Sequence, residues 1–418
     1  MFDKLISKDT SMPDSAMIHL EHTYGANNYD PLPVVLVRGE GVYVWDEEGK
    51  QYLDMMSAYS AVSHGHCHPA LVAALQAQST QLNIVSRAFY TNKLGLFLQR
   101  ACELTGFEQA LPMNTGAEAV ETAIKAARKW AYTVKGVPSD QANIIACAGN
   151  FHGRTTTIIG FSTEPEYKNG FGPFSAGLQT IPYGDIAALE KAITPHTAAF
   201  LVEPIQGEGG IIVPPTGYLK ACAQLCKQHN VLLICDEIQT GLGRTGKWLA
   251  CQHESVQPDA IVLGKALGGG LLPVSLFLTR KEVMDVFTPG THGSTFGGNP
   301  LAAAVGLAAL HVLEQENLIE RAEKLGFYFQ KKLKALNSPL IKEVRGRGLL
   351  IGVEINSQYS AKKICLALLK RGILTKETHA TVIRFAPPLI ITEEQIDFTI
   401  QMLEEVINSV ILSVAKDH

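Results

Sequence analysis

One lysine stands where lysines are rarely found, directly after an apolar run. Lys265 follows Ile261-Val-Leu-Gly264, and three glycines at 268–270 come soon after it. Because lysine is almost never buried without a partner, a chemical role is one reason for this position. An amine there can condense with an aldehyde to form a Schiff base, and the glycines let the backbone lie close to a ligand. The alternative is a surface lysine, which the three glycines argue against.

A carboxylate follows a second apolar run. Asp236 and Glu237 come directly after Val231-Leu-Leu-Ile-Cys235. In α/β sheets ligands bind at the carboxyl ends of strands, and a carboxylate buried there needs a cation or several donors. The alternative is an aspartate that caps the next helix, and for a single example the two interpretations are about equally supported.

The segment 114–119, Asn-Thr-Gly-Ala-Glu-Ala, has the pattern of a helix N-terminus. Thr115 and Glu118 form a capping box, and the small residues Gly116 and Ala117 occupy the first turn. Their free backbone N–H groups and the helix dipole favour a phosphate at this end. Taken alone, an ordinary capped helix is the better interpretation, because capping boxes are common.

These three features complement one another chemically. A cofactor with an aldehyde, a basic ring nitrogen and a phosphate would use the lysine, the carboxylate and the helix N-terminus together. Pyridoxal 5′-phosphate carries all three groups. We therefore predict pyridoxal 5′-phosphate as the cofactor.

The elements that must position these residues alternate between strands and helices. From about 110 to 310, apolar runs with the length of buried strands alternate with helical patterns such as 217–229. This alternation predicts an α/β fold with a mostly parallel central sheet. Residues 34–53 alternate apolar and polar side chains around glycines, which predicts antiparallel hairpins. The apolar runs are 143–148, 198–202, 231–235, 260–263 and 274–279.

We expect two domains of unequal size. A large α/β domain that binds the cofactor would span residues 76–310. A smaller α+β domain would be built from both ends of the chain, with 1–75 as its N-terminal part and 311–418 as its C-terminal part.

Composition and charge exclude several classes of protein. Of the 418 residues, 46% are hydrophobic and 18% are charged, so the chain can bury a large core. A net charge of −4 argues against a protein that coats nucleic acid or an anionic membrane. Residues 260–279 are apolar, but Lys265, the glycines and Pro273 predict a strand, a loop and a second strand instead of a membrane span. The eight cysteines form no CxxC pair and residues 1–17 hold no apolar signal core, so we expect reduced thiols and a cytoplasmic location.

The chain resembles the class III, fold-type I pyridoxal-phosphate aminotransferases. The resemblance runs from about Tyr24 to the C-terminal region, and it implies a fold-type I architecture and transamination. The motifs that carry it are NTGAEA (114–119), GNFHGRT (149–155), VEPIQGEGG (202–210), DEIQTGLGRTG (236–246), LGKALGGG (263–270) and HGSTFGGNP (292–300).

The resemblance implies a role for each cofactor-binding residue. Lys265 would form the Schiff base and move the substrate proton, while Asp236 would keep the ring nitrogen protonated. Gln239 would bond the ring hydroxyl. The remaining contacts would be Phe151 and Ile238 on the two ring faces, Gly116 and Ala117 at the phosphate, and Ser294 and Thr295 reaching the phosphate from the neighbouring subunit. The active site therefore implies a homodimer.

The resemblance also implies which substrates are bound. Arg154 would hold a substrate carboxylate far from the reacting amine, and Arg384 would bind the α-carboxylate of glutamate or 2-oxoglutarate. Glu208 would pair with Arg384 while the other donor is bound. From the residues alone, Glu208 is better interpreted as a solvated loop acid and Arg384 as a surface arginine. Within the class, the chain most resembles members that transfer the δ-amino group of L-ornithine to 2-oxoglutarate, giving glutamate 5-semialdehyde, which cyclises, and glutamate.

Two tyrosines favour ornithine over related donors. Tyr29, in the segment 24–33, would contact the free α-amino group of ornithine, and Tyr59 would line the same pocket. Acetylornithine and 4-aminobutyrate aminotransferases share the Glu–Arg pair, so they are the alternatives. A non-catalytic cofactor-binding protein is disfavoured by the complete Asp–Lys set. The chain departs from the animal ornithine enzymes at His152 in place of Trp, and also at Ala117 and Gly209.

The segment 63–69, Ser-His-Gly-His-Cys-His-Pro, resembles a metal site but is not expected to be one. Its four potential ligands are too close together to form a closed tetrahedral shell, and no second cluster follows at zinc-finger spacing. We predict no metal.

Overall fold

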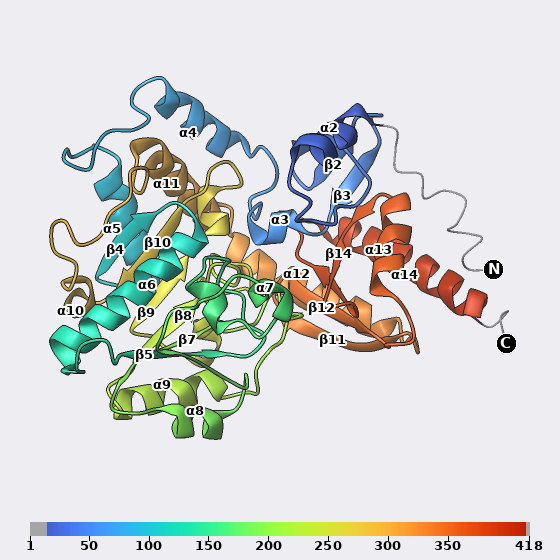
Figure 1. Ribbon diagram of the computed structural model, residues 1–418. Helices are drawn as coiled ribbons and strands as arrows, with labels where there is room; N and C mark the ends of the chain where they lie inside the picture. Colours follow the sequence, from blue (N-terminus) through green and yellow to red (C-terminus); the bar gives the residue numbers. More distant parts are fainter. Residues whose placement is uncertain (1–14, 415–418) are drawn as a thin grey trace.

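The computed structural model describes residues 15–414. This part of the chain holds one seven-stranded sheet and two four-stranded sheets. In Figure 1 the seven-stranded sheet and its helices form the larger body, and the two smaller sheets lie beside it together with α2 and α12–α14. Residues 1–14, which carry most of the segment tested for a signal peptide, lie outside the described residues.

The seven-stranded sheet has the order β4-β10-β9-β8-β7-β5-β6. The strands from β5 to β9 pair in parallel, and β10 is antiparallel to both β4 and β9. This arrangement confirms the predicted α/β fold with a mostly parallel sheet. Its strands are β4 (Gln109–Met113), β5 (Asn143–Cys147), β6 (Leu178–Ile181), β7 (Thr197–Val202), β8 (Leu232–Asp236), β9 (Ala260–Leu263) and β10 (Ser275–Thr279).

The apolar stretch 260–279 folds as predicted from its charge and glycines. It forms β9, a short 3₁₀ turn at Lys265–Gly268 and then β10. Within residues 15–414, no helix combines the length and apolar character needed to cross a membrane.

Helices cover both faces of the large sheet. Helix α6 packs with one apolar face, since its buried residues include Val120, Ala123, Ile124 and Ala127, and it contacts strands β8 and β9. The helices of this body are α4 (Pro69–Ser79), α5 (Leu94–Thr105), α6 (Gly116–Trp130), α7 (Pro165–Lys168), α8 (Ile186–Ala192), α9 (Tyr218–Gln228), α10 (Lys281–Met284) and α11 (Pro300–Gln315).

The first small sheet joins the two ends of the chain. Strands β1 (Leu36–Glu40), β2 (Tyr43–Asp46) and β3 (Gln51–Asp54) are antiparallel, as predicted, and β13 (Ile373–Leu374) pairs in parallel with β3. The limits of the domains at 75/76 and 310/311 remain a prediction. Helices α4 and α11 run across these limits and pack against each other.

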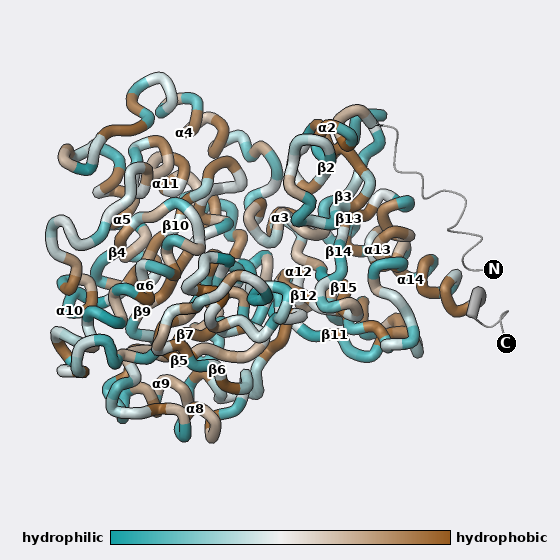
Figure 2. Tube along the Cα trace, in the orientation of Figure 1, coloured by the Kyte–Doolittle hydropathy of each residue, from teal (hydrophilic) through white to brown (hydrophobic). Residues whose placement is uncertain are grey.

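The second small sheet has the order β11-β12-β15-β14. Hydrophobic and hydrophilic residues alternate along α13 and α14, as expected for helices with one buried face (Figure 2). The strands are β11 (Ile341–Arg347), β12 (Leu350–Ile355), β14 (Lys376–Thr378) and β15 (Val382–Phe385), and the helices are α2 (Ala16–Tyr24), α3 (Ser57–Ser60), α12 (Leu318–Ala335), α13 (Ala361–Lys370) and α14 (Glu393–Val414).

Candidate active site

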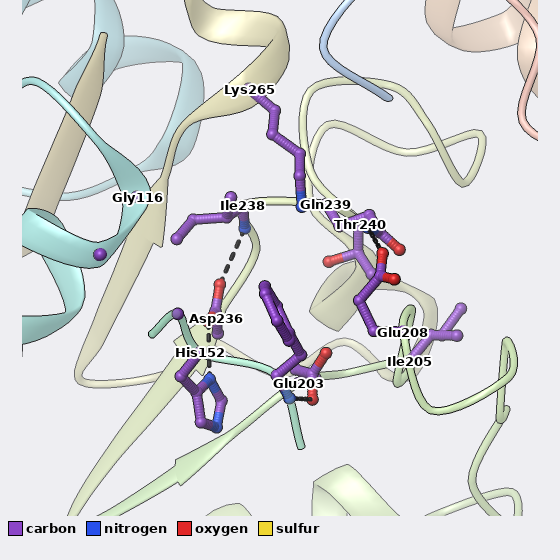
Figure 3. A pocket seen from close by; sticks show the side chains of 13 residues that line it. Gly116, His152, Glu203, Ile205, Glu208, Asp236, Ile238, Gln239, Thr240 and Lys265 are labelled. Atoms are coloured by element: carbon purple, nitrogen blue, oxygen red, sulfur yellow. Dashed lines mark hydrogen bonds and ion pairs between the residues drawn. The ribbon is translucent and has the colours of Figure 1, made fainter. Parts of the chain in front are cut away.

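A cavity of about 210 Å³ lies at the carboxyl ends of the parallel strands. This volume is below the range of about 300–1,000 Å³ that is typical of small-molecule sites. The lining residues are Gly116, Ala117, Phe151, His152, Gly153, Glu203, Ile205, Glu208, Asp236, Ile238, Gln239, Thr240 and Lys265, most of which Figure 3 labels.

Three neighbouring strands deliver the charged residues to this cavity. Glu203 follows β7, Asp236 ends β8, and Lys265 follows β9 after one glycine. Because these strands are parallel, their carboxyl ends meet at one edge of the sheet. The structure therefore brings Lys265 and Asp236 together, as the sequence predicted.

Lys265 reaches into the cavity without a fixed partner. The side chain is partly buried, and within residues 15–414 it has no hydrogen bond or ion pair. Burial lowers the pKa of Lys265, although the charges of Glu208 and Asp236 act in the opposite direction. An amine with a lowered pKa is more often uncharged, and only the uncharged form is a nucleophile.

Asp236 is held on both oxygens. Its Oδ1 accepts a hydrogen bond from the Ile238 N–H at 3.1 Å, and its Oδ2 lies 2.7 Å from His152 Nδ1. Both side chains are buried. Burial alone would lower the pKa of His152, but the hydrogen bond and charge of Asp236 and the charge of Glu203 raise it. Figure 3 shows His152 beneath Asp236, with the two bonds of the carboxylate drawn as dashed lines. Sequence reasoning noted His152 only as a departure and gave it no role.

Glu203 is a second residue that sequence reasoning missed. The carboxylate is buried, and it accepts hydrogen bonds from the N–H groups of Phe151 at 3.1 Å and Gly207 at 3.4 Å. Burial raises the pKa of Glu203 to about 7, and the Asp236 charge adds to this while His152 opposes it. The sequence does contain a pattern that indicates Glu203, because this carboxylate follows the apolar run 198–202 just as Asp236 follows the run 231–235.

The helix that starts at Gly116 offers free donors to the cavity. Thr115 caps α6 by accepting from the Glu118 N–H, and the Glu118 carboxylate accepts from the Thr115 N–H at 2.7 Å, so the predicted capping box is present. The N–H groups of Gly116 and Ala117 have no acceptor within the helix. A Cβ at Gly116 would come within 2.9 Å of Ile238 Cδ1, so the glycine lets Ile238 pack against the start of the helix.

Glu208 and Arg384 form an ion pair at the edge of the cavity. Arg384 Nη1 bonds Glu208 Oε1, Nη2 lies 3.3 Å from Oε2, and Gln239 Nε2 donates to the same carboxylate at 3.1 Å. The Arg384 side chain is only 3% exposed, so it is not a surface arginine. Burial would raise the pKa of Glu208, but the charge and hydrogen bond of Arg384, the charge of Lys265 and the hydrogen bond of Gln239 together hold that pKa below its ordinary value.

Each of the two predicted carboxylate-binding arginines lies over an aromatic ring. The guanidinium of Arg384 lies 4.9 Å from the ring centre of Tyr59. The guanidinium of Arg154 lies 4.1 Å from Tyr167 and 5.6 Å from Phe151. Such contacts orient a guanidinium without occupying its N–H donors. Sequence reasoning identified both arginines but not Tyr167.

Six predicted residues are not among those that line this cavity. Tyr59, Arg154 and Arg384 lie beside it, in contact with one another or with its lining residues Glu208 and Phe151.

The other three predicted residues are Tyr29, Ser294 and Thr295, which line other hollows. Tyr29 is 71% exposed and belongs to a separate hollow formed by residues 17–36. Ser294 and Thr295 line another hollow with residues 84–87, and Ser294 Oγ accepts from Asn114 Nδ2 at 3.0 Å. The single chain therefore does not bring these three residues to the lysine.

The histidines of the segment 63–69 each bond a different partner. His64 Nε2 lies 3.0 Å from the Ala309 carbonyl, while the side chains of His66 and His68 contact Asp54 and Glu316. Across residues 15–414, no group of three or more His, Cys, Asp or Glu side chains is placed to hold a metal ion. Cys222 and Cys226, one helical turn apart on α9, are buried in the core.

Comparison with known proteins identifies related sequences and structures. Residues 24–407 match the family model of the class III aminotransferases. The ornithine aminotransferase of Exiguobacterium sp. is 57% identical, covering 94% of this chain and 97% of that protein.

Two solved structures bear on the choice of donor. The ornithine aminotransferase of Toxoplasma gondii, described with partial occupancy of PLP at its active site, has a TM-score of 0.94 and 45% identity, with 99% and 98% of the two chains covered. The acetylornithine aminotransferase of Elizabethkingia anophelis has a TM-score of 0.85 and 52% identity, with 94% and 98% covered.

Proposed function

The chain belongs to the class III aminotransferases, and we propose that it transfers the δ-amino group of L-ornithine to 2-oxoglutarate. The products would be glutamate and glutamate 5-semialdehyde, which cyclises to pyrroline-5-carboxylate. The observation that carries transfer of a terminal amino group is the Glu208–Arg384 ion pair, whose Glu208 lines the same cavity as Lys265, a lysine without a hydrogen bond or ion pair within residues 15–414. The similarity to an ornithine aminotransferase supports ornithine as the donor. Enzymes of this class use pyridoxal 5′-phosphate.

The residues of the cavity fit that cofactor. The N–H groups of Gly116 and Ala117 suit its phosphate, Asp236 suits its ring nitrogen, and Lys265 suits its aldehyde. Gln239 Oε1 is buried and has no hydrogen-bond partner in the described part of the chain, which fits an acceptor facing a hydroxyl.

Bound there, the cofactor would supply a protonated ring that stabilises negative charge on the substrate carbon as it loses a proton. The Lys265 amine would accept that proton from the substrate carbon and would donate it to the carbon that forms the aldehyde group of the free cofactor. Asp236, aligned by His152 and Ile238, would hold the proton on the ring nitrogen. Phe151 and Ile238 would enclose the ring and exclude water.

The ion pair gives a physical account of which amine reacts. While Glu208 neutralises Arg384, a substrate α-carboxylate gains little by binding at Arg384. The α-carboxylate of ornithine would then go to Arg154, which places its terminal amine near Lys265. Glutamate and 2-oxoglutarate would displace Glu208 and bind Arg384 through their own α-carboxylates, with Arg154 holding the distal one. Tyr29 would contact the free α-amino group of ornithine and Tyr59 would line its pocket.

Acetylornithine and 4-aminobutyrate remain the second candidates as donors. The similarity to an acetylornithine enzyme at 52% identity favours the first of them. In addition, Tyr29, the residue expected to reject an acetylated amine, lies outside the cavity of the single chain.

The proposal is tested by its two products. The purified enzyme supplied with ornithine and 2-oxoglutarate should form pyrroline-5-carboxylate and glutamate in a one-to-one ratio, as measured by chromatography that separates pyrroline-5-carboxylate from its isomer pyrroline-2-carboxylate. Formation of glutamate with the 2-carboxylate isomer, which loss of the α-amino group would give, or with no cyclic product, would contradict transfer of the δ-amino group.

We also propose a homodimer with shared active sites in a cytoplasmic compartment. Ser294 and Thr295 line an open hollow away from Lys265, and exposed apolar side chains including Phe89, Tyr90 and Phe296 flank it in the sequence. All eight cysteines are free, as a reducing compartment would keep them.

A further inference from the structure

Arg244 is fully buried, and its partners are neutral oxygens. It lies in the loop that follows β8 and the residues Asp236 to Gln239. Its Nη1 donates to the carbonyl oxygens of Leu349 at 3.1 Å and Pro387 at 2.6 Å. Arginine is rarely buried without a carboxylate, and within residues 15–414 Arg244 forms no ion pair. Such a residue needs an explanation beyond packing.

The other end of the guanidinium contacts two serines. Arg244 Nη2 donates to Ser57 Oγ at 3.2 Å and to Ser63 Oγ at 2.9 Å. Each hydroxyl passes its own hydrogen on, because Ser57 Oγ donates to the Ala386 carbonyl at 2.6 Å and Ser63 Oγ donates to the Ser60 carbonyl at 3.0 Å. Arg244 therefore reaches both Ser57 and Ser60 through hydroxyl groups.

Ser57 and Ser60 are the ends of an unusual turn. The four consecutive residues 57–60 have φ values of 43°, 47°, 60° and 77°, and none of them is glycine. Residues with side chains disfavour this left-handed region, so the surrounding contacts must hold the turn in place. Part of this support comes from Asp54 Oδ1, which accepts from the Ser57 N–H at 2.9 Å. The remainder includes the two serine hydroxyls bonded to Arg244.

The turn presents Tyr59 to Arg384. The ring centre of Tyr59 lies 4.9 Å from the Arg384 guanidinium, and Arg384 lies on β15, which runs directly into Ala386 and Pro387. Arg244 bonds the Pro387 carbonyl itself and bonds the Ala386 carbonyl through Ser57. One guanidinium thus fixes both the turn that carries Tyr59 and the strand end that carries Arg384.

We propose that Arg244 is a positioning residue for substrate selection, which holds Tyr59 against Arg384 through Ser57 and Ser63 and couples this pair to the loop that follows Asp236. This inference rests on the proposed function, because Tyr59 and Arg384 are assigned there to the substrate. Arg244 itself does not line the cavity, and it would act on the substrate-binding residues through its hydrogen bonds to Ser57 and Ser63.

The sharpest test removes one hydrogen bond from the route. Ser63→Ala deletes the link to Ser60 and leaves Arg244 its other three acceptors, so the protein should fold. We expect the KM for ornithine to rise about five- to tenfold, the size typical of one hydrogen bond, while kcat changes less than about twofold. The dissociation constant of the cofactor, measured by absorbance, should stay within about twofold of wild type. Thr105→Val, which deletes a buried hydroxyl of α5 whose bond goes to Ala101, should leave KM unchanged.

A double-mutant cycle with Tyr59→Ala separates positioning from general loosening. If Ser63 acts through Tyr59, Ser63→Ala should raise KM by less than about twofold in the Tyr59→Ala background. Equal effects of Ser63→Ala in both backgrounds, or an unchanged KM in the single variant, would overturn the inference. If the wild type does not accept ornithine, the proposed function fails, and the same cycle is measured with whichever of N-acetylornithine or 4-aminobutyrate it accepts.

Discussion

At the scale of single residues, the cavity places one amine among three carboxylates. Lys265 has a lowered pKa and, within residues 15–414, no hydrogen bond, whereas Asp236, Glu203 and Glu208 each accept bonds from fixed donors. This difference suits their roles, because a nucleophilic amine must be free to react, whereas a carboxylate that stabilises charge must be fixed in position.

Removal of the lysine amine tests its role directly. Lys265→Ala should abolish the visible absorption band of the lysine-bound cofactor and lower turnover about 10³-fold or more, because the proton carrier is lost. Lys220, an exposed lysine of α9, offers a control, and Lys220→Ala should keep both spectrum and turnover. An unchanged visible spectrum in Lys265→Ala would rule out this lysine as the attachment point.

Glu203 should make stability depend on pH. Because its pKa is raised to about 7 in the folded protein, the folded state holds a proton there that the unfolded state has released above about pH 4.5. The free energy of unfolding should therefore fall as pH rises from about 4.5 to about 7. The raised pKa of His152 changes the free energy of unfolding in the same direction, since its stabilising contribution is present below about pH 6.5 and is lost as pH rises through its folded pKa.

Glu203→Gln removes the titrating carboxyl of Glu203 and leaves His152 with its other charged neighbour, Asp236. Between pH 5 and 8 the variant should lose about 2 kcal/mol less of its free energy of unfolding than wild type, as measured by urea denaturation. Parallel curves of stability against pH for the two proteins would show that Glu203 does not titrate in this range.

The sequence predicted some of these residues and missed others for a physical reason. Lys265 and Asp236 stood out because a charge that follows a buried strand is rare. The roles of His152 and Glu203 depend on contacts with residues up to 84 positions away, such as the bond from His152 to Asp236, which no local pattern encodes. The burial of Arg384 was also invisible, because its strand resembles an ordinary edge strand in sequence.

At the scale of elements, the start of α6 combines a stabilising cap with a binding surface. Thr115→Ala should lower the free energy of unfolding by about 1 kcal/mol and also weaken cofactor binding, because the first turn then frays where Gly116 and Ala117 present their N–H groups. Asp185 caps α8 in the same way, through the Ala188 N–H, and does not line the cavity.

The Asp185 cap therefore provides a matched control. Asp185→Ala should cost similar stability and leave the dissociation constant of the cofactor unchanged. Equal weakening of cofactor binding in both variants would mean that the effect of Thr115→Ala comes from stability alone.

Strands buried on both faces were predictable and edge strands were not. The five predicted apolar runs all became strands of the large sheet. Strands β4 and β6 were missed because they are the two edges: β4 contains Pro112, which an edge tolerates, and β6 is only partly buried. The left-handed turn at 57–60 was also missed, because Ser-Ala-Tyr-Ser contains no residue that favours positive φ.

At the scale of the whole molecule, the two ends of the chain complete the site that the middle begins. Strand β13 pairs with β3, and the β15 residue Arg384 pairs with Glu208. Alternation of strand and helix predicted the α/β body, but only the folded chain shows which terminal residue meets which central one. In the proposed homodimer, Ser294 and Thr295 would in the same way complete the site of a second subunit.

Subunit mixing tests whether the sites are shared. Lys265→Ala chains and Ser294→Ala/Thr295→Ala chains should each be defective alone. Mixed after reversible dissociation, they should recover up to about a quarter of the wild-type active sites, because half of the dimers pair the two chains and each such dimer contains one intact site. No recovery of activity in verified heterodimers would place Ser294 and Thr295 in the site of their own chain.

The donor preference tests the central claim most directly. The measurement compares kcat/KM for ornithine, N-acetylornithine and 4-aminobutyrate, with 2-oxoglutarate as the acceptor. We predict that ornithine exceeds both other donors by at least about tenfold, because Arg154, Tyr29 and Tyr59 would bind its free α-amino acid end. A higher kcat/KM for N-acetylornithine or 4-aminobutyrate would contradict the account.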